Sequence, residues 1–90
     1  MNPIPPGWQE RQRPGRLERR YLFEDYQQLR DFLDRAAALS EQHSLYPDMG
    51  FGRDYVNITI HADAEDGQLG DLHRQFAQWL DDLGGYKTTP

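Results

Sequence analysis

Hydrophobic and polar positions change their period several times along this 90-residue chain, and each change marks an expected element. Residues 16–23 alternate in the way typical of a half-buried strand. Residues 8–12 form a shorter candidate strand, and the Arg-Pro-Gly sequence at residues 13–15 is a turn signal because proline presets φ and glycine accepts a positive φ. The two segments together predict a hairpin. One side of its longer strand carries Leu17, Arg19, Tyr21 and Phe23.

Two longer segments repeat hydrophobic residues every three or four positions, the spacing of a helix that buries one face. The first opens at Glu24 and Asp25, acids that the macrodipole favours at a helix N-terminus, and extends to about residue 42. The second runs from about residue 69 to 83, where two glycines stop it. The predicted apolar stripes are Leu29, Phe32, Leu33, Ala36, Ala37 and Leu39 in the first helix, and Leu69, Leu72, Phe76, Trp79, Leu80 and Leu83 in the second.

The segment between the helices contains one clear strand and one weak strand. Val56, Ile58 and Ile60 alternate with polar residues, whereas residues 46–55 are a loop or a weak strand, and an acidic turn follows at residues 62–67. Because neither helix is apolar all round, each is expected to lie on one face of a sheet, which gives a two-layer α+β sandwich. The other sheet face then stays open unless a partner covers it.

Length and composition predict one small domain at residues 7–85, with a disordered Pro-rich segment at 1–6 and a tail at 86–90. The absence of cysteine excludes disulfides and thiolate metal sites. No apolar run approaches the ~18 residues of a membrane span, and the first residues lack the pattern of a signal peptide. We therefore expect a cytoplasmic protein without a membrane partner.

Charge is distributed unevenly. Residues 9–20 contain five arginines and two glutamates, although the whole chain has a net charge of -5. The basic stretch is too short, and the chain too acidic, to indicate a nucleic-acid partner. Arginine suits paired recognition of carboxylates, so this stretch either lies on the solvent side of two strands or meets an acidic protein surface.

Several short motifs share an order and spacing with one known family. They are Gly7-Trp8, Phe23-Glu24-Asp25-Tyr26, Glu41 followed by Leu45-Tyr46-Pro47-Asp48, and the alternating residues 56–60. Over residues 7–83 the chain resembles the pterin-4a-carbinolamine dehydratase family. The resemblance implies an antiparallel four-stranded sheet with two helices on one face.

The resemblance also implies where catalytic groups would stand, and the chain departs from the family there. Three histidines that remove water from a 4a-hydroxytetrahydropterin are replaced by Leu45, Tyr46 and Asp63. Leucine transfers no proton, and a tyrosine pKa near 10 suits acid–base work at neutral pH poorly. We therefore predict no catalytic residues and no cofactor. His61, paired with His43, is the one candidate for a displaced acid or base, and no metal site is predicted because no close ligand pair is present.

One branch of the family accommodates these departures: the dehydratase-like proteins of bacteria with α-carboxysomes, which act as Rubisco assembly factors. The chain resembles them in its short length, its Arg-rich first hairpin, and Tyr46-Pro47-Asp48 followed by Phe51-Gly52-Arg53-Asp54-Tyr55-Val56-Asn57. The resemblance implies a chaperone-like, carboxysome-associated protein whose partner is the Rubisco large subunit. Two alternatives remain: a weak or altered 4a-hydroxytetrahydrobiopterin dehydratase using Tyr46, His61 and Asp63, or a pterin-binding sensor.

Two features could carry binding. Residues 46–55 mix aromatic residues, methionine and arginine with glycines, a composition enriched in interface cores. The polar side of residues 55–61 is expected to join Arg16, Glu18 and Arg20 on the open sheet face. An exposed strand edge in so small a domain also favours a homodimer. The candidate binding residues are Tyr46, Asp48, Met49, Phe51, Arg53, Tyr55, Asn57, Arg19 and Arg20.

Overall fold

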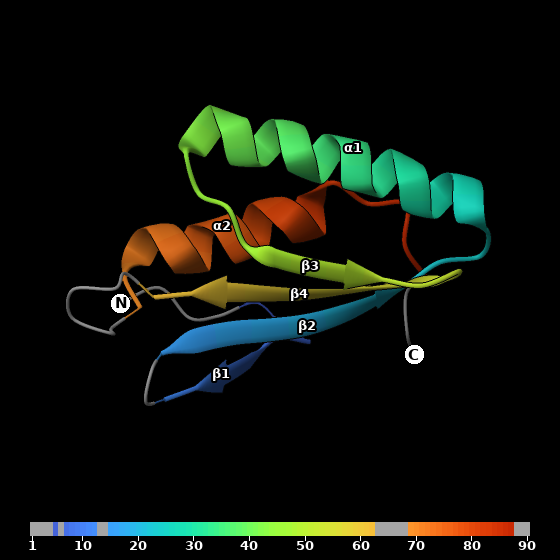
Figure 1. The fold of residues 1–90 in the computed structure, drawn as a ribbon. Helices are drawn as coiled ribbons and strands as arrows, with labels where there is room; N and C mark the ends of the chain where they lie inside the picture. Colours follow the sequence, from blue (N-terminus) through green and yellow to red (C-terminus); the bar gives the residue numbers. More distant parts are fainter. Residues whose placement is uncertain (1–4, 6, 13–14, 63–68, 88–90) are drawn as a thin grey trace.

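The computed structural model describes residues 5, 7–12, 15–62 and 69–87. Its elements in chain order are β1 (Gln9–Arg11), β2 (Arg16–Leu22), α1 (Tyr26–His43), β3 (Asp48–Phe51), β4 (Tyr55–His61) and α2 (Asp71–Asp82). The strands form one sheet in the order β1-β2-β4-β3, and every neighbouring pair is antiparallel. Both helices cover the same face of this sheet (Figure 1). The predicted two-layer α+β sandwich is confirmed, and β3 is the weak strand expected within residues 46–55.

Some predictions fall on parts of the chain outside the described residues. They are the acidic turn, Asp63, and most of the N-terminal segment and of the C-terminal tail. Of the expected tail, Tyr86 and Lys87 are described, and both contact the domain. The Lys87 backbone nitrogen donates to the Leu22 carbonyl oxygen at 2.7 Å, beside the end of β2.

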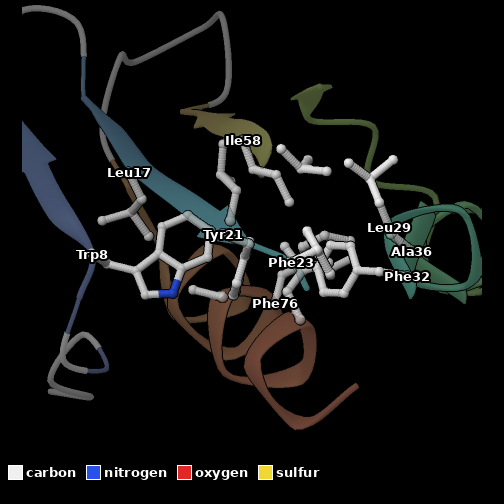
Figure 2. Packing of buried hydrophobic residues seen from close by; sticks show 13 residues of the cluster. Trp8, Leu17, Tyr21, Phe23, Leu29, Phe32, Ala36, Ile58 and Phe76 are labelled. Atoms are coloured by element: carbon white, nitrogen blue, oxygen red, sulfur yellow. The ribbon is translucent and has the colours of Figure 1, made fainter. Parts of the chain in front are cut away.

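The core lies between the sheet and the two helices. Alternation along β2 and β4 points Leu17, Tyr21 and Ile58 inward, where they are almost fully buried. Phe32 of α1 and Phe76 of α2 close over them from the helix layer (Figure 2). Burial of each such side chain contributes about 1.5–3 kcal/mol to the free energy of folding. The buried hydrophobic residues of the described chain form one cluster, so this cluster is the main source of stabilising apolar burial.

Two positions of the predicted helix stripes are wrong. Ala37 is exposed and Ser40 is buried, because the inward face of α1 runs through Leu29, Phe32, Ala36 and Ser40. In α2, Leu72 is 48% exposed and His73 is 6% exposed. His73 turns inward because its Nδ1 accepts a hydrogen bond from the Gly70 backbone nitrogen at 2.8 Å, which satisfies a free N–H at the helix start.

A buried polar network joins the sheet to the C-terminal end of α2. Asp81 Oδ1 accepts hydrogen bonds from Trp8 Nε1 and Arg19 Nη1, each at 3.1 Å, and from the Tyr21 hydroxyl. The Arg19 guanidinium carbon lies 4.5 Å from the Tyr21 ring centroid and 5.2 Å from that of Tyr86. The Arg19 and Asp81 side chains are only 15% and 12% exposed, so this ion pair belongs to the interior.

Candidate functional site

The open face of the sheet carries a mixed polar surface. In the β2–β4 ladder, Arg20 pairs with Asn57, Leu22 with Tyr55, and Arg16 with His61. Residues opposite one another in an antiparallel pair point to the same side. The prediction that the polar side of residues 55–61 joins Arg16, Glu18 and Arg20 on one face is therefore confirmed.

One part of this face is an outer-face cluster of Arg20, Tyr55 and Asn57, which are joined by side-chain contacts. Arg20 Nε donates to Asn57 Oδ1 at 2.8 Å, and the guanidinium carbon lies 4.7 Å from the Tyr55 ring centroid. Gly52 allows this arrangement, since a Cβ there would lie 2.3 Å from the Tyr55 ring. A cation over an exposed aromatic ring contributes about 0.5–1 kcal/mol, so the arginine is held in place although it is exposed.

The rest of the open face is a mosaic of opposite charges. Arg16 Nε lies 2.9 Å and Arg11 Nε 3.7 Å from Glu18 Oε1. Across the sheet, on β4 and β3, His61 Nε2 lies 2.7 Å from Asp48 Oδ2. On this face, positive side chains therefore lie beside carboxylates.

Three other candidate binding residues lie along β3 on the helix side of the sheet. Met49 pairs with the buried Ile58, and Phe51 pairs with the buried Val56, so both point toward the helix layer. Phe51 nevertheless remains 50% exposed, and Tyr46 before the strand is 70% exposed. These side chains form an apolar strip beside the sheet edge.

The remaining two candidates are separated from both groups. Arg53 lies in the turn after β3 and lines a cavity of about 540 Å³ with Glu24, Tyr26 and Asp54. Arg19 points inward to Asp81, whereas its neighbour Arg20 points outward. The structure thus divides the nine predicted binding residues among the open face, the β3 strip, one turn and the interior.

The two histidine-replacing positions that the structure describes, Leu45 and Tyr46, line one cavity. Ser44 ends α1 in a left-handed conformation with φ 52° and ψ 38°, which turns the chain there. The cavity measures about 400 Å³, and both His61 and His73 line it. Its complete lining is Ser44, Leu45, Tyr46, His61, Gly70, Asp71, Leu72 and His73.

His73 is a cavity residue that the sequence reasoning missed. His73 stands three residues after Gly70, at the start of a predicted helix, and this is the spacing of a capping box. That spacing is a sequence signal for a side chain that turns back toward the helix start. Because Nδ1 accepts the Gly70 hydrogen bond, the neutral ring carries its proton on Nε2. The lining of the cavity therefore includes two histidines, but none at position 45 or 46.

The described residues contain no group of three or more metal-ligating side chains that could hold a metal ion. None of the helices in the described part of the chain is both long and apolar enough to cross a membrane.

Comparison with known proteins places this chain in a known family. The family profile described as "Pterin 4 alpha carbinolamine dehydratase" matches residues 1–83, and the chain belongs to this family. A solved structure described as a pterin dehydratase-like protein and RuBisCO assembly factor in the alpha-carboxysome is similar, with 43% sequence identity and a TM-score of 0.77. That likeness covers 90% of this chain and 93% of that chain.

A second solved structure shares the fold at greater sequence distance. It is a transcriptional coactivator/pterin dehydratase from Brucella Melitensis, with 21% identity and a TM-score of 0.79 over 89% of this chain and 84% of that chain. Comparison with curated proteins gave no significant match.

Proposed function

We propose that this chain is a Rubisco assembly factor of chaperone type, associated with α-carboxysomes, whose partner is the Rubisco large subunit. The observation that carries the proposal is the 43% identity, over 90% of this chain, to the pterin dehydratase-like protein described as such a factor. Leu45 and Tyr46 support it, because neither residue supplies the imidazole that the dehydration reaction uses.

The open sheet face is the proposed surface for the client. It presents an arginine–aromatic cluster inside a polar mosaic, and arginine and tyrosine are among the residue types that most often dominate binding energy. The Arg11–Glu18 ion pair on this face is largely exposed, so it contributes little to stability and can rearrange when a client binds. A modest affinity suits a factor that holds an assembly intermediate until native subunits displace it.

Charge reversal in the outer-face cluster tests this surface. Arg20→Glu removes both the hydrogen bond to Asn57 and the cation over Tyr55, and it places a repelling charge where an acidic client group would bind. We expect about tenfold weaker client binding, which corresponds to ~1.4 kcal/mol, and a lower yield of assembled Rubisco on co-expression.

The matched control is Arg35→Glu on α1, where the exposed side chain donates to the Leu83 carbonyl oxygen. Native gels after co-expression measure the assembled Rubisco in each case. An unchanged yield of assembled Rubisco with Arg20→Glu would show that the client does not bind at the open face. No increase in yield with the wild-type protein would remove the assembly function itself.

The homodimer predicted from the sequence is also part of the proposal. Among the described residues, β1 and β3 are the edge strands of the sheet, and a two-fold pairing at either edge would extend it across two protomers. Sedimentation equilibrium at several protein concentrations measures the association. A monomer at all concentrations would contradict it.

A weak dehydratase is the second candidate function, because His61 and His73 line the same cavity as Leu45 and Tyr46. General acid–base catalysis contributes about 100- to 10,000-fold. We expect the purified protein to turn over a 4a-hydroxytetrahydropterin no faster than about one hundredth of the rate of a family member that keeps its histidines. A stopped-flow absorbance assay measures this.

Turnover that disappears in both His61→Ala and His73→Ala, but persists in Leu72→Ala, would favour the enzyme over the assembly factor. Leu72 lines the same cavity and transfers no proton, so it is the matched control. Calorimetry measures pterin binding directly. Binding of pterin by a protein that shows no turnover would favour the pterin-sensor alternative.

A further inference from the structure

The open sheet face contains a shallow trough around the Arg20–Asn57 pair. Gly50 is the neighbour of Asn57 on β3, and a Cβ added to Gly50 would meet nothing within 4 Å. On the β1 side, Gly7 and Gln9 line a cavity of about 450 Å³ together with Arg20 and Asn57. No helix of the described chain covers this face (Figure 1). The two glycines therefore leave room for a partner to approach the pair.

Arg20 presents hydrogen-bond donors that no described residue uses. Its Nε donates to Asn57 Oδ1 at 2.8 Å, and its guanidinium carbon lies 4.7 Å from the Tyr55 ring centroid. The two terminal nitrogens, Nη1 and Nη2, have no acceptor among the described residues. Because Asn57 and Tyr55 already hold the plane of the guanidinium, an incoming carboxylate can accept hydrogen bonds from it with little further loss of side-chain entropy.

The charges around the trough favour a carboxylate over a phosphate as the bound group. Glu18 lines the same cavity as Arg20. Its Oε1 lies 2.9 Å from Arg16 Nε, so part of the Glu18 charge is offset. A carboxylate brings one negative charge, whereas a phosphate monoester brings about -1.5 to -2 and is repelled more strongly by Glu18.

An apolar contact adjoins the arginine on the same face. Leu22 follows Arg20 by two residues on β2, pairs with Tyr55 and is 38% exposed. Two residues of a strand span about 6.6 Å. Residues four apart in a helix are separated by about 6 Å along its axis. A helix aligned with β2 therefore places a hydrophobic side chain on Leu22 and an acidic side chain on Arg20 when the two are one turn apart.

We propose that the open face binds an amphipathic α-helix of a partner protein, in which an aspartate or glutamate lies four residues from a large hydrophobic residue. A helix satisfies its own backbone N–H and C=O groups, whereas an extended segment lying across a sheet face leaves them without partners. A docked helix also adds a layer to the sheet, as helices do within layered domains. The inference rests on the proposed function for the identity of the partner, the Rubisco large subunit.

A second copy of this chain lacks the required pattern in its described helices. The large hydrophobic residues that are exposed there are Tyr26 and Leu72. The residues three and four positions before and after each of them are neither aspartate nor glutamate. The docked helix is therefore assigned to another protein.

A designed helical peptide tests the proposal directly. The glutamate peptide is fluorescently labelled, is built from alanine and glutamine, and has about 17 residues, enough to populate a helix. It carries a central glutamate and a leucine four residues before and after it, so either direction along β2 presents the same pattern. The lysine peptide replaces the glutamate, and the shifted peptide moves the leucines to two residues before and after it, on the opposite side of the helix.

Anisotropy measures the binding of each peptide to the full chain. We expect saturable binding of the glutamate peptide and about tenfold weaker binding of the other two, because one loses the contact to Arg20 and the other the contact to Leu22. Equal binding of the three peptides, or no binding of the glutamate peptide, would overturn the proposal.

Variants of the protein give the complementary test. Arg20→Glu should weaken the glutamate peptide about tenfold and strengthen the lysine peptide. Leu22→Thr keeps a residue suited to strands and should weaken the glutamate peptide about fivefold without changing the shifted peptide. Arg35→Glu, on the exposed side of α1, is the control and should change neither. An unchanged preference in Arg20→Glu, shown to be folded by circular dichroism, would refute the site.

Co-expression with Rubisco separates this inference from the assembly function. A protein that raises the yield of assembled Rubisco but does not bind the glutamate peptide would contradict the helix site and leave the assembly function in place. A protein that binds the peptides in the expected order but does not raise the yield would support the helix site and contradict the assembly function.

Discussion

Replacing Asp81 with alanine is expected to lower the free energy of unfolding by about 3–5 kcal/mol. The carboxylate accepts hydrogen bonds from Trp8 Nε1, Arg19 Nη1 and the Tyr21 hydroxyl, and its side chain is 12% exposed. Without it, the Arg19 guanidinium stays largely buried and loses this counter-charge, and two further donors lose an acceptor. In a domain of this size such a loss is a large share of the total stability.

Urea unfolding followed by tryptophan fluorescence measures this effect. Asp82→Ala is the matched control, because Asp82 is exposed and accepts a hydrogen bond from the Gln78 side chain on the surface of α2. We expect that control to change stability by less than about 0.5 kcal/mol. A similar small change for Asp81→Ala would show that the network does not stabilise the fold.

A double variant separates the ion pair from the packing around it. Arg19→Met with Asp81→Leu replaces two buried charges with apolar side chains of similar length, a change that is often neutral or stabilising. We expect the double variant to unfold at higher urea than Asp81→Ala. The comparison then attributes the loss in the single variant to an uncompensated buried charge.

The same network gives structural roles to sequence features that first suggested function. Trp8 of the Gly-Trp motif is 5% exposed and donates to Asp81, which ties the chain before β1 to the end of α2. Gly7 has φ +94°, and a Cβ there would lie 2.8 Å from Arg19 Nη1. The motif therefore fixes the first hairpin, and with it the position of the Arg20 side of the open face.

The hydrophobic period predicted the layers of this fold well. Alternation over residues 16–23 and 55–61 and helical spacing elsewhere identified the two long strands and both helices, because burial of one face governs each of these segments. The short edge strand β3 was only a weak prediction. Its residues Asp48, Gly50 and Phe51 are exposed, so burial leaves little pattern there.

The site was less predictable, because it depends on contacts between segments that are distant in the sequence. The alternation placed Arg19 and Arg20 on opposite sides of the strand, but it did not show that Asp81, 62 residues away, would pair with Arg19. The pairing of His61 with Asp48 follows from the β3–β4 register, which the sequence did not define. The sequence pattern also did not predict that Ser40 is buried on the inward face of α1.

Raising the pH above about 10 is expected to destabilise the fold by about 1.4 kcal/mol per pH unit through Tyr21. Burial, and then the hydrogen bond to Asp81, raise the pKa of Tyr21 far above its usual value near 10. Below about pH 10 the tyrosine keeps its proton in both states, and the stabilising contribution is fully present. Above that pH the unfolded chain releases the proton and the folded chain does not, so stability falls as the pH rises.

Tyr21→Phe isolates this contribution, since phenylalanine keeps the ring and carries no ionisable group. We expect the variant to be less stable at neutral pH, because the Asp81 hydrogen bond is lost, but to lose less stability between about pH 9 and pH 11.5. Burial also raises the pKa of Tyr86, so part of the slope should persist. Urea unfolding at each pH measures the slope. Phe32→Leu is the control, because it destabilises the fold and leaves the tyrosines intact, and it should keep the wild-type slope. Equal slopes for Tyr21→Phe and the wild type would show that the Tyr21 proton does not couple to folding.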